Sequence, residues 1–202
     1  MNAILRRAPL CAALLLAAAC GPRPAPEPVD ARPAASMPAA SDFSVYDLES
    51  RWTDQAGQGR ALASLAGRPQ VLALVYTHCA HTCPAILAEF KRMEAALPAG
   101  PGAPGFVLVS IDPARDTPAR LAEFAASARL DPARWTVLTG DDESVRELAA
   151  LLRVRYRPEP GGEYSHANAY LVLDADGRIV QRQDGLGDPD RALATLRALA
   201  AR

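Results

Sequence analysis

The chain has 202 residues, of which half are apolar and 22% are charged, and its net charge is −1. These values are typical of a globular protein with one domain of ordinary size and short additional segments. The basic residues are almost all arginines, with Lys91 as the single lysine, and they are scattered along the sequence. A nucleic-acid-binding surface needs clustered basic residues, so the composition argues against that class of function.

The first residues have the pattern of a secretory signal peptide. Arg6 and Arg7 form a short basic start, and the apolar run over residues 8–19 is too short to favour a transmembrane helix. Residues 16–21, LAAACG, resemble a bacterial lipobox, with alanine at the second position where leucine is preferred. In that motif Cys20 becomes the lipid-bearing first residue of the mature protein. The alternative is ordinary cleavage nearby, with Cys20 left unmodified or removed.

The signal peptide is therefore expected over residues 1–19, followed by a tether over residues 20–42. The tether is rich in proline and alanine and has too few large apolar side chains to fold. The remaining residues, 43–202, are expected to form the folded domain. These features predict an exported lipoprotein, anchored to a membrane and facing the periplasm or the outer face of the cytoplasmic membrane.

From residue 43 onward, strand and helix patterns alternate. The stretch 43–50 and the glycine-containing turn after it predict an opening hairpin. The later elements are expected in this order: a buried strand at 71–77, a helix at 84–97, a strand at 106–112, a helix after Asp116-Thr117-Pro118, a strand at 135–140, a helix at 142–154, a hairpin around 174–177 and a helix from 188 to the C-terminus. A longer loop, residues 155–168, is inserted before the last hairpin. This order predicts an α/β fold whose central strands are parallel and flanked by helices.

Half of the four cysteines and two of the three histidines lie in one octapeptide, THCAHTCP, at residues 77–84. It lies at the end of the strand at 71–77, and Asp112 and Arg115 lie at the end of the strand at 106–112. Sites in parallel sheets form beyond the carboxyl ends of the strands, so these residues are expected to share one edge of the sheet. The inserted loop contains His166 and is long enough to reach the same edge.

Cys79 precedes a helix N-terminus, where unpaired backbone N–H groups stabilise a thiolate and lower its pKa. Cys83 lies near the first turn and can face the same way. Two such thiolates either bind a soft metal ion or oxidise to a disulfide, and a bridge across so short a loop would stabilise the fold little. A distant histidine would complete two sulfurs and one nitrogen, a set suited to Cu(I) and less complete for Zn(II).

Several nearby side chains have less specific interpretations. Asp112, Arg115 and Asp116 are expected to be scaffold or capping residues rather than ligands, because Asp-Thr-Pro is a good helix start. His78 and His81 are equally compatible with a part in the site and with exposure to solvent. Met37 and Met93 are expected in the tether and the core.

The domain resembles the SCO/SenC family of thioredoxin-fold copper proteins. The resemblance lies in Cys79-x-x-x-Cys83-Pro84 after an apolar strand and in residues 110–118, SIDPARDTP. It continues in residues 138–140, LTG, and in His166-x-x-x-Tyr170-Leu171 with Asp174. The chain differs from the family at residues 80–82, AHT, where members read more like Pro-Asp-Val.

The resemblance implies a copper ion, Cu(I) or Cu(II), with Cys79, Cys83 and His166 as ligands. It implies a thioredoxin-like fold with a central mixed sheet, an N-terminal hairpin and an inserted loop before the last hairpin. The implied role is a metallochaperone that supplies the binuclear copper site of cytochrome c oxidase. Its partners would be the copper-site subunit of that oxidase, and other copper carriers or thiol reductants.

A second hypothesis is a thiol–disulfide oxidoreductase, with Cys79 as nucleophile and Cys83 as resolving thiol and a Cys79–Cys83 disulfide as its oxidised form. Its target would be the cysteines of the oxidase subunit or of another exported protein. The three-residue spacing differs from the Cys-x-x-Cys of thioredoxins, which counts against general reductase work. A third hypothesis, a copper-responsive redox sensor, has no sequence feature of its own. Whether the protein is an enzyme is left open between these hypotheses.

Overall fold

The structure is a computed structural model that describes residues 43–79 and 82–201. The predicted signal peptide, Cys20, the tether with Met37, and His81 lie outside the described residues. No helix in the described part of the chain combines the length and apolarity needed to cross a membrane.

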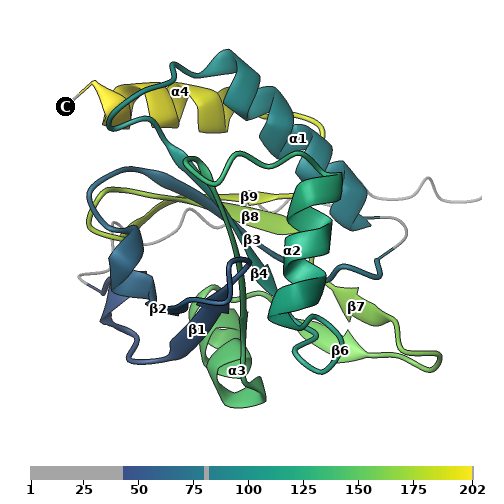
Figure 1. Cartoon of the computed structure of the whole chain (residues 1–202). Coiled ribbons are helices and arrows are strands. Elements are labelled where there is room, and N and C mark those ends of the chain that lie inside the picture. The colour runs from purple at the N-terminus through teal and green to yellow at the C-terminus, as the bar shows by residue number, and fades with distance from the viewer. Residues whose placement is uncertain (1–42, 80–81, 202) are drawn as a thin grey trace, which may run out of the picture. The chain divides into compact units, whose positions relative to one another are not determined.

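A mixed seven-stranded sheet runs through the domain, with the strand order β2-β1-β5-β4-β3-β8-β9 (Figure 1). Its strands are β1 (Arg51–Asp54), β2 (Gly59–Ala61), β3 (Gln70–Val75), β4 (Gly105–Ser110), β5 (Trp135–Gly140), β8 (Ala169–Leu173) and β9 (Ile179–Asp184). Strands β3, β4 and β5 are parallel, whereas β1 and β8 pair antiparallel with β5 and β3. The predicted α/β fold with parallel central strands is confirmed.

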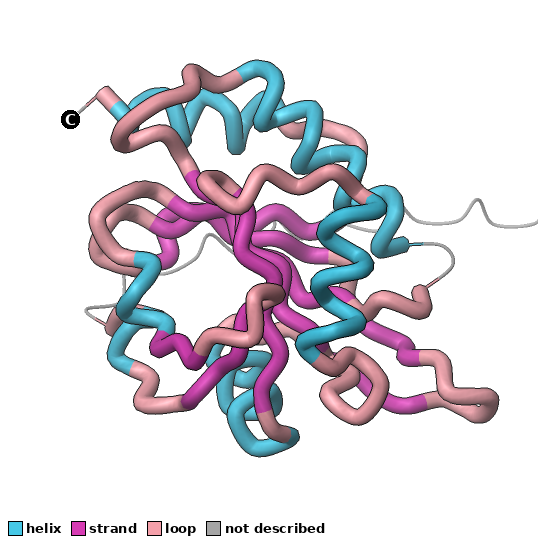
Figure 2. The backbone as a smooth tube through the Cα atoms, viewed as in Figure 1, coloured by secondary structure: helices cyan, strands magenta, loops and turns pink. Residues whose placement is uncertain are grey.

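In the part of the chain that the structure describes, the α-helices are α1 (Thr82–Ala96), α2 (Pro118–Ser127), α3 (Asp142–Leu151) and α4 (Asp190–Ala200). Helices α1 and α4 lie side by side on one side of the sheet and α3 on the opposite side (Figures 1 and 2). Helix α2 begins as the sequence predicts, since Thr117 accepts a hydrogen bond from the backbone of Arg120 and Pro118 takes the first turn.

The core forms because β3 and β4 are buried at every position. Such continuous apolar strands need helices on both faces, which is the arrangement observed. Phe90 of α1 packs among Phe106, Trp135 and Tyr170, with the Phe106 and Trp135 rings stacked at 4.8 Å. Each buried aromatic side chain contributes about 2 kcal/mol or more of transfer free energy. Met93 lies in this core, as expected.

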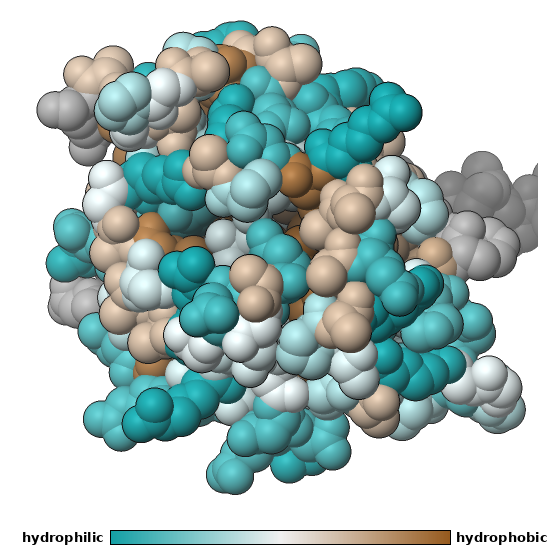
Figure 3. All heavy atoms as spheres, viewed as in Figure 1, coloured by the Kyte–Doolittle hydropathy of each residue, from teal (hydrophilic) through white to brown (hydrophobic). Residues whose placement is uncertain are grey.

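The surface is mainly polar on the face drawn in Figure 3, where apolar residues show only in small areas. Among the described residues, Phe43 and Val180 are the only large apolar side chains that are exposed. Exposed large apolar side chains are thus few in the described part of the chain.

The opening hairpin begins later than the sequence predicts. Residues 43–50 contain a short 3-10 helix, η1 (Val45–Asp47), and the hairpin β1–β2 follows it. Ser44 accepts a hydrogen bond from the backbone of Tyr46, and Asp47 accepts one from the backbone of Ser44. This capping box satisfies backbone groups locally and competes with strand pairing. A second 3-10 helix, η2 (Leu62–Leu65), leads into β3.

The inserted loop is an ordered hairpin rather than a structureless excursion. Strand β6 (Tyr156–Pro158) pairs antiparallel with β7 (Tyr164–His166), so that Tyr156 stands opposite His166. The hairpin projects from the lower right of the domain in Figure 1, beyond the ends of the central strands. It places His166 at the edge of the sheet where β3 ends.

Candidate metal centre

The two cysteines are positioned by the connection from β3 to α1. The strand ends at Val75, Cys79 follows a turn, and Cys83 lies in the first turn of α1. The backbone N–H of Cys83 donates to Sγ of Cys79 at 3.3 Å, and that of Tyr76 donates to Sγ of Cys83 at 3.5 Å. Cys79 is half-buried and Cys83 is buried. Both sulfurs therefore face backbone donors at the end of a buried strand, as the sequence predicts.

His166 completes a three-residue cluster with these cysteines. One ligand atom from each of Cys79, Cys83 and His166 lies within 4.8 Å of the other two. The distance from Sγ of Cys83 to Nε2 of His166 is 4.0 Å. These three residues could hold one metal ion, and two sulfurs with one nitrogen suit a soft ion. The structure thus brings together the three residues that the sequence singles out.

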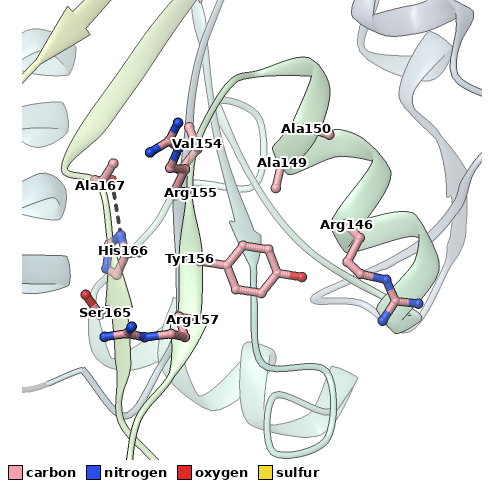
Figure 4. Close-up of a pocket in the computed structure, with 10 residues that line it drawn as sticks. All are labelled: Arg146, Ala149, Ala150, Val154, Arg155, Tyr156, Arg157, Ser165, His166 and Ala167. Atoms are coloured by element: carbon pink, nitrogen blue, oxygen red, sulfur yellow. Dashed lines mark hydrogen bonds between the residues drawn. The ribbon is translucent and has the colours of Figure 1, made fainter.

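The hydrogen bond at the far side of the imidazole selects its tautomer. Nδ1 of His166 lies 3.3 Å from the carbonyl oxygen of Ala167 (Figure 4). A carbonyl can only accept, so Nδ1 carries the proton and Nε2 presents its lone pair toward the sulfurs. This is the arrangement by which a backbone carbonyl orients a metal-binding histidine.

Burial sets the protonation state of the site without a metal. It raises the pKa of the Cys83 thiol well above its ordinary value, although the backbone N–H of Tyr76 opposes this effect. Burial also lowers the pKa of His166 below its usual range, so the ring is neutral at physiological pH. At Cys83, desolvation by burial therefore opposes the stabilisation that a helix N-terminus gives to a thiolate.

Tyr76 holds the His166 hairpin against the end of β3. Its hydroxyl donates to Oε2 of Glu163 at 2.7 Å and accepts from the backbone N–H of Tyr164 at 3.3 Å. Its ring makes edge contacts with the rings of Tyr164 and His166, at centroid distances of 5.3 and 5.9 Å. Tyr76 is not among the residues that the sequence singles out. The sequence does contain one signal, a tyrosine at the end of an apolar strand. A buried tyrosine hydroxyl needs a hydrogen-bond partner, which indicates a contact with another segment.

Arg115 braces the tip of the same hairpin. Its Nε donates to the carboxylate of buried Asp112, and its Nη2 donates to the carbonyl oxygen of Gly162. Gly162 has φ +85°, and a Cβ atom there would lie 2.7 Å from Nη1 of Arg115. The positive φ favours glycine at this position, and a side chain there would displace the Arg115 guanidinium.

Asp116 organises the turn that precedes Cys79. It is fully buried and accepts hydrogen bonds from the backbone and hydroxyl of Thr77, at 3.0 and 2.5 Å, and from the hydroxyl of Ser110 at 2.6 Å. Nδ1 of His78 lies 3.6 Å from this carboxylate and does not belong to the three-residue cluster. Asp112, Arg115 and Asp116 thus have the scaffold roles that the sequence predicts.

Cys79 and Cys83 are not joined by a disulfide in the structure. The arrangement is that of a reduced dithiol beside a neutral imidazole, which can bind a soft cation or exchange electrons with a disulfide.

Comparison with known proteins agrees with this geometry. The sequence profile of the SCO1/SenC family matches residues 41–201, which is most of the chain. The chain belongs to the SCO1/SenC family. The solved structure of copper-bound ScoI from Bradyrhizobium japonicum is 30% identical to this SCO1/SenC protein. That match covers 74% of this chain and 96% of ScoI, with a TM-score of 0.63.

Two further solved structures share the fold of this SCO1/SenC protein. A SCO1/SenC family lipoprotein from Bacillus anthracis is 23% identical, covers 77% of this chain and 95% of its own, and has a TM-score of 0.66. BsSco, a member of the Sco family of cytochrome c oxidase assembly proteins in which a disulfide switch has been identified, is 20% identical. It covers 79% of this chain and 96% of its own, with a TM-score of 0.63. The thioredoxin-like fold is confirmed.

Proposed function

We propose that the protein is a copper chaperone that binds one copper ion through Cys79, Cys83 and His166. The observation that carries the proposal is the convergence of these three ligand atoms within 4.8 Å of one another from separate elements. Family membership and the 30% identity to copper-bound ScoI support copper as the metal. The order of affinities among divalent metals also favours copper over zinc at a given site.

The ligand set suits transfer as well as binding. Two thiolates and one imidazole satisfy Cu(I) with three donors, and a partner thiolate or imidazole can add to such a site before one donor leaves. Cys79 is more exposed than Cys83, so an incoming ligand meets that sulfur from the solvent side. Copper then passes by stepwise ligand exchange and is never released as a hydrated ion.

The recipient that we propose is the binuclear copper site of cytochrome c oxidase. Membership in the SCO1/SenC family supports this assignment, and BsSco is named as a cytochrome c oxidase assembly protein. Mixing the copper-loaded protein with the metal-free, reduced copper-site domain of the oxidase subunit should move copper to that domain. Transfer would be followed by separating the two proteins and measuring their copper content. Retention of copper by the chaperone, when the recipient loads from a Cu(I) chelator, would contradict this role.

The alternative function is reduction of the recipient's disulfide. The reduced pair of a half-buried Cys79 and a buried Cys83 suits a nucleophile and a resolving thiol. The thiolate of Cys79 would attack the target disulfide and form a mixed disulfide. The thiolate of Cys83 would then attack Cys79 in that mixed disulfide. The target would leave as two thiols, having gained two electrons, and the protein would be left with a Cys79–Cys83 disulfide. Metal-free protein would then reduce the oxidised recipient, and His166→Ala would retain this activity. Loss of copper transfer but not of thiol transfer in that variant separates the two functions.

Membrane anchoring through Cys20 completes the proposal and rests on the sequence of residues 1–42. A lipid on Cys20 and a proline-rich tether would hold the domain near a membrane-bound oxidase. Cys20→Ser should move the exported protein from the membrane fraction to the soluble fraction. Membrane association that survives this change would contradict the lipid anchor.

A further inference from the structure

A groove between α3 and the β6–β7 hairpin lies directly beside the proposed copper site (Figure 4). Its volume is about 750 Å³, and its lining includes Arg146, Arg155, Arg157, Tyr156 and His166. Tyr156 points across the groove from β6 toward α3. The groove is thus open space next to a proposed copper ligand, outside the three-atom cluster itself.

His166 is shared by the groove and the copper site. Its imidazole lies in the groove lining, whereas its Nε2 is 4.0 Å from Sγ of Cys83. An occupant of the groove would therefore be separated from the thiols by a single aromatic ring. A surface that positions a copper donor or acceptor needs this kind of proximity.

The charge of the lining is positive. Three arginines and no carboxylate line the groove. The charge of Arg157 is compensated by Glu159, because Nη2 of Arg157 lies 2.6 Å from Oε1 of Glu159. Among the described residues, neither Arg146 nor Arg155 lies within ion-pair distance of a carboxylate. Arg146 and Arg155 thus line the groove without a direct ion pair, although the charge of Arg146 also acts on the nearby carboxylate of Asp141. Guanidinium groups favour paired hydrogen bonds to carboxylates.

The floor is apolar. Ala149 and Val154 are buried and Tyr156 is half-buried, so the base of the groove offers aliphatic and aromatic surface between the arginines. A small inorganic anion would use only the charge. A short polypeptide segment with both acidic and apolar side chains would use the charge and the floor together.

From these observations we infer that the groove docks an acidic segment of the protein with which copper is exchanged. The guanidinium groups of Arg146 and Arg155 bind its carboxylates, and an apolar side chain rests against Tyr156. The inference rests on the proposed copper function for the identity of the partner, but docking itself requires no metal. A flat anionic membrane surface fits less well, because the basic groups line a concavity.

The test measures docking on the full chain, reduced and free of metal. The probe is a short fluorescein-labelled peptide that alternates glutamate and leucine, and its glutamine counterpart is the control peptide. Fluorescence anisotropy should show binding of the acidic peptide that weakens as salt is raised, and little binding of the control peptide. The double variant Arg146→Glu, Arg155→Glu should weaken binding by about tenfold or more.

A matched variant distinguishes the effect of the groove arginines on binding from the effect of the protein's net charge. Arg51→Glu, Arg191→Glu makes the same change at exposed arginines outside the groove and should bind the acidic peptide as the unmodified chain does. Equal binding by all three proteins, or equal loss in both variants, would overturn the inference. Displacement of the peptide by inorganic phosphate, added at the same concentration of negative charge, would show that the groove binds any small anion. This result would also overturn the inference.

Two further measurements distinguish the alternatives. Vesicles of equal parts phosphatidylglycerol and phosphatidylcholine should bind the unmodified chain and the groove variant alike; loss of vesicle binding in the groove variant alone would assign the groove to the membrane instead. The Cu(I) affinity of the groove variant should be unchanged. Absence of Cu(I) binding in every protein would defeat the copper function and leave peptide docking intact, so the two failures are distinguishable.

Discussion

The hydroxyl of Tyr76 donates a 2.7 Å hydrogen bond to Oε2 of Glu163, which joins the end of a central strand to the hairpin that carries His166. The two residues are 87 positions apart in the sequence. The cysteines lie on the β3–α1 connection and the histidine on the hairpin, so this contact fixes the distance between the two halves of the proposed copper site.

Replacing Tyr76 with phenylalanine tests that relationship. The change keeps the ring contacts to His166 and Tyr164. It removes the hydrogen bonds of the hydroxyl to Glu163, to the backbone of Tyr164 and to the side chain of Cys79. We expect the free energy of unfolding to fall by about 1 kcal/mol. The Cu(I) affinity should fall about fivefold, because binding must then also order the hairpin. Competition with a Cu(I) chelator measures the affinity.

The control is Tyr46→Phe, which removes a hydrogen bond of 3.3 Å from the Tyr46 hydroxyl to the carbonyl of Leu65, away from the site. It should lower stability by a similar amount and leave the Cu(I) affinity unchanged. An equal loss of affinity in both variants would show that Tyr76 acts only through general stability.

The tip of the hairpin offers a matched pair of glycines. Gly161 and Gly162 have φ +89° and +85°, so alanine at either position is strained by about 1 kcal/mol. Only at Gly162 does the added methyl group meet the Arg115 guanidinium. Gly162→Ala should therefore weaken Cu(I) binding about threefold relative to Gly161→Ala. Identical Cu(I) affinities in the two variants would show that Arg115 does not position His166.

The buried carboxylate of Asp116 should contribute strongly to stability. Asp116→Asn leaves the shape unchanged but presents an amide donor to the groups that now donate to the carboxylate, and we expect a loss of about 2 kcal/mol. Asp184→Asn is the control, because its partner Arg182 pairs with it at an exposed position and such pairs contribute little. Urea unfolding measures both losses. If Asp116→Asn lost as little unfolding free energy as the control, Asp116 would not organise the turn before Cys79.

Copper affinity should rise with pH between pH 6.5 and 8. Burial raises the pKa of the Cys83 thiol, so this thiol is protonated throughout that range and must lose its proton to bind copper. Burial lowers the pKa of His166, so the imidazole is neutral there and competes for no proton. The Cu(I) affinity should increase by roughly tenfold per pH unit for each thiol proton released. An affinity independent of pH would mean that Cys83 is already a thiolate or is not a ligand.

The sequence allowed much of the site to be predicted. Cys79 and Cys83 follow a continuous apolar strand, and that pattern places them at the carboxyl edge of a parallel sheet because such strands must be buried on both faces. Asp116-Thr117-Pro118 marked the start of α2 through local capping chemistry. His166 was identified through the family resemblance, since nothing local to its loop specifies a ligand.

The remaining features depend on tertiary contacts that local patterns do not encode. The β6–β7 hairpin is short and polar and contains Pro158, so its strands lack the apolar alternation that reveals a hairpin. Its order depends on Tyr76 and Arg115, which come from distant positions in the chain. The raised thiol pKa of Cys83 likewise follows from burial, which a helix N-terminus alone does not reveal.

An anaerobic Cu(I) titration of the reduced protein against a competing chelator is the most direct test of the copper site formed by Cys79, Cys83 and His166. It would compare the unmodified chain with His166→Ala and, as a control near the site, with His78→Ala. We expect one tightly bound Cu(I) in the unmodified chain, an affinity at least about tenfold lower in His166→Ala, and no change in His78→Ala. An unchanged affinity in His166→Ala would contradict the three-ligand site, and the absence of tight binding in the unmodified chain would leave disulfide reduction as the function of the dithiol.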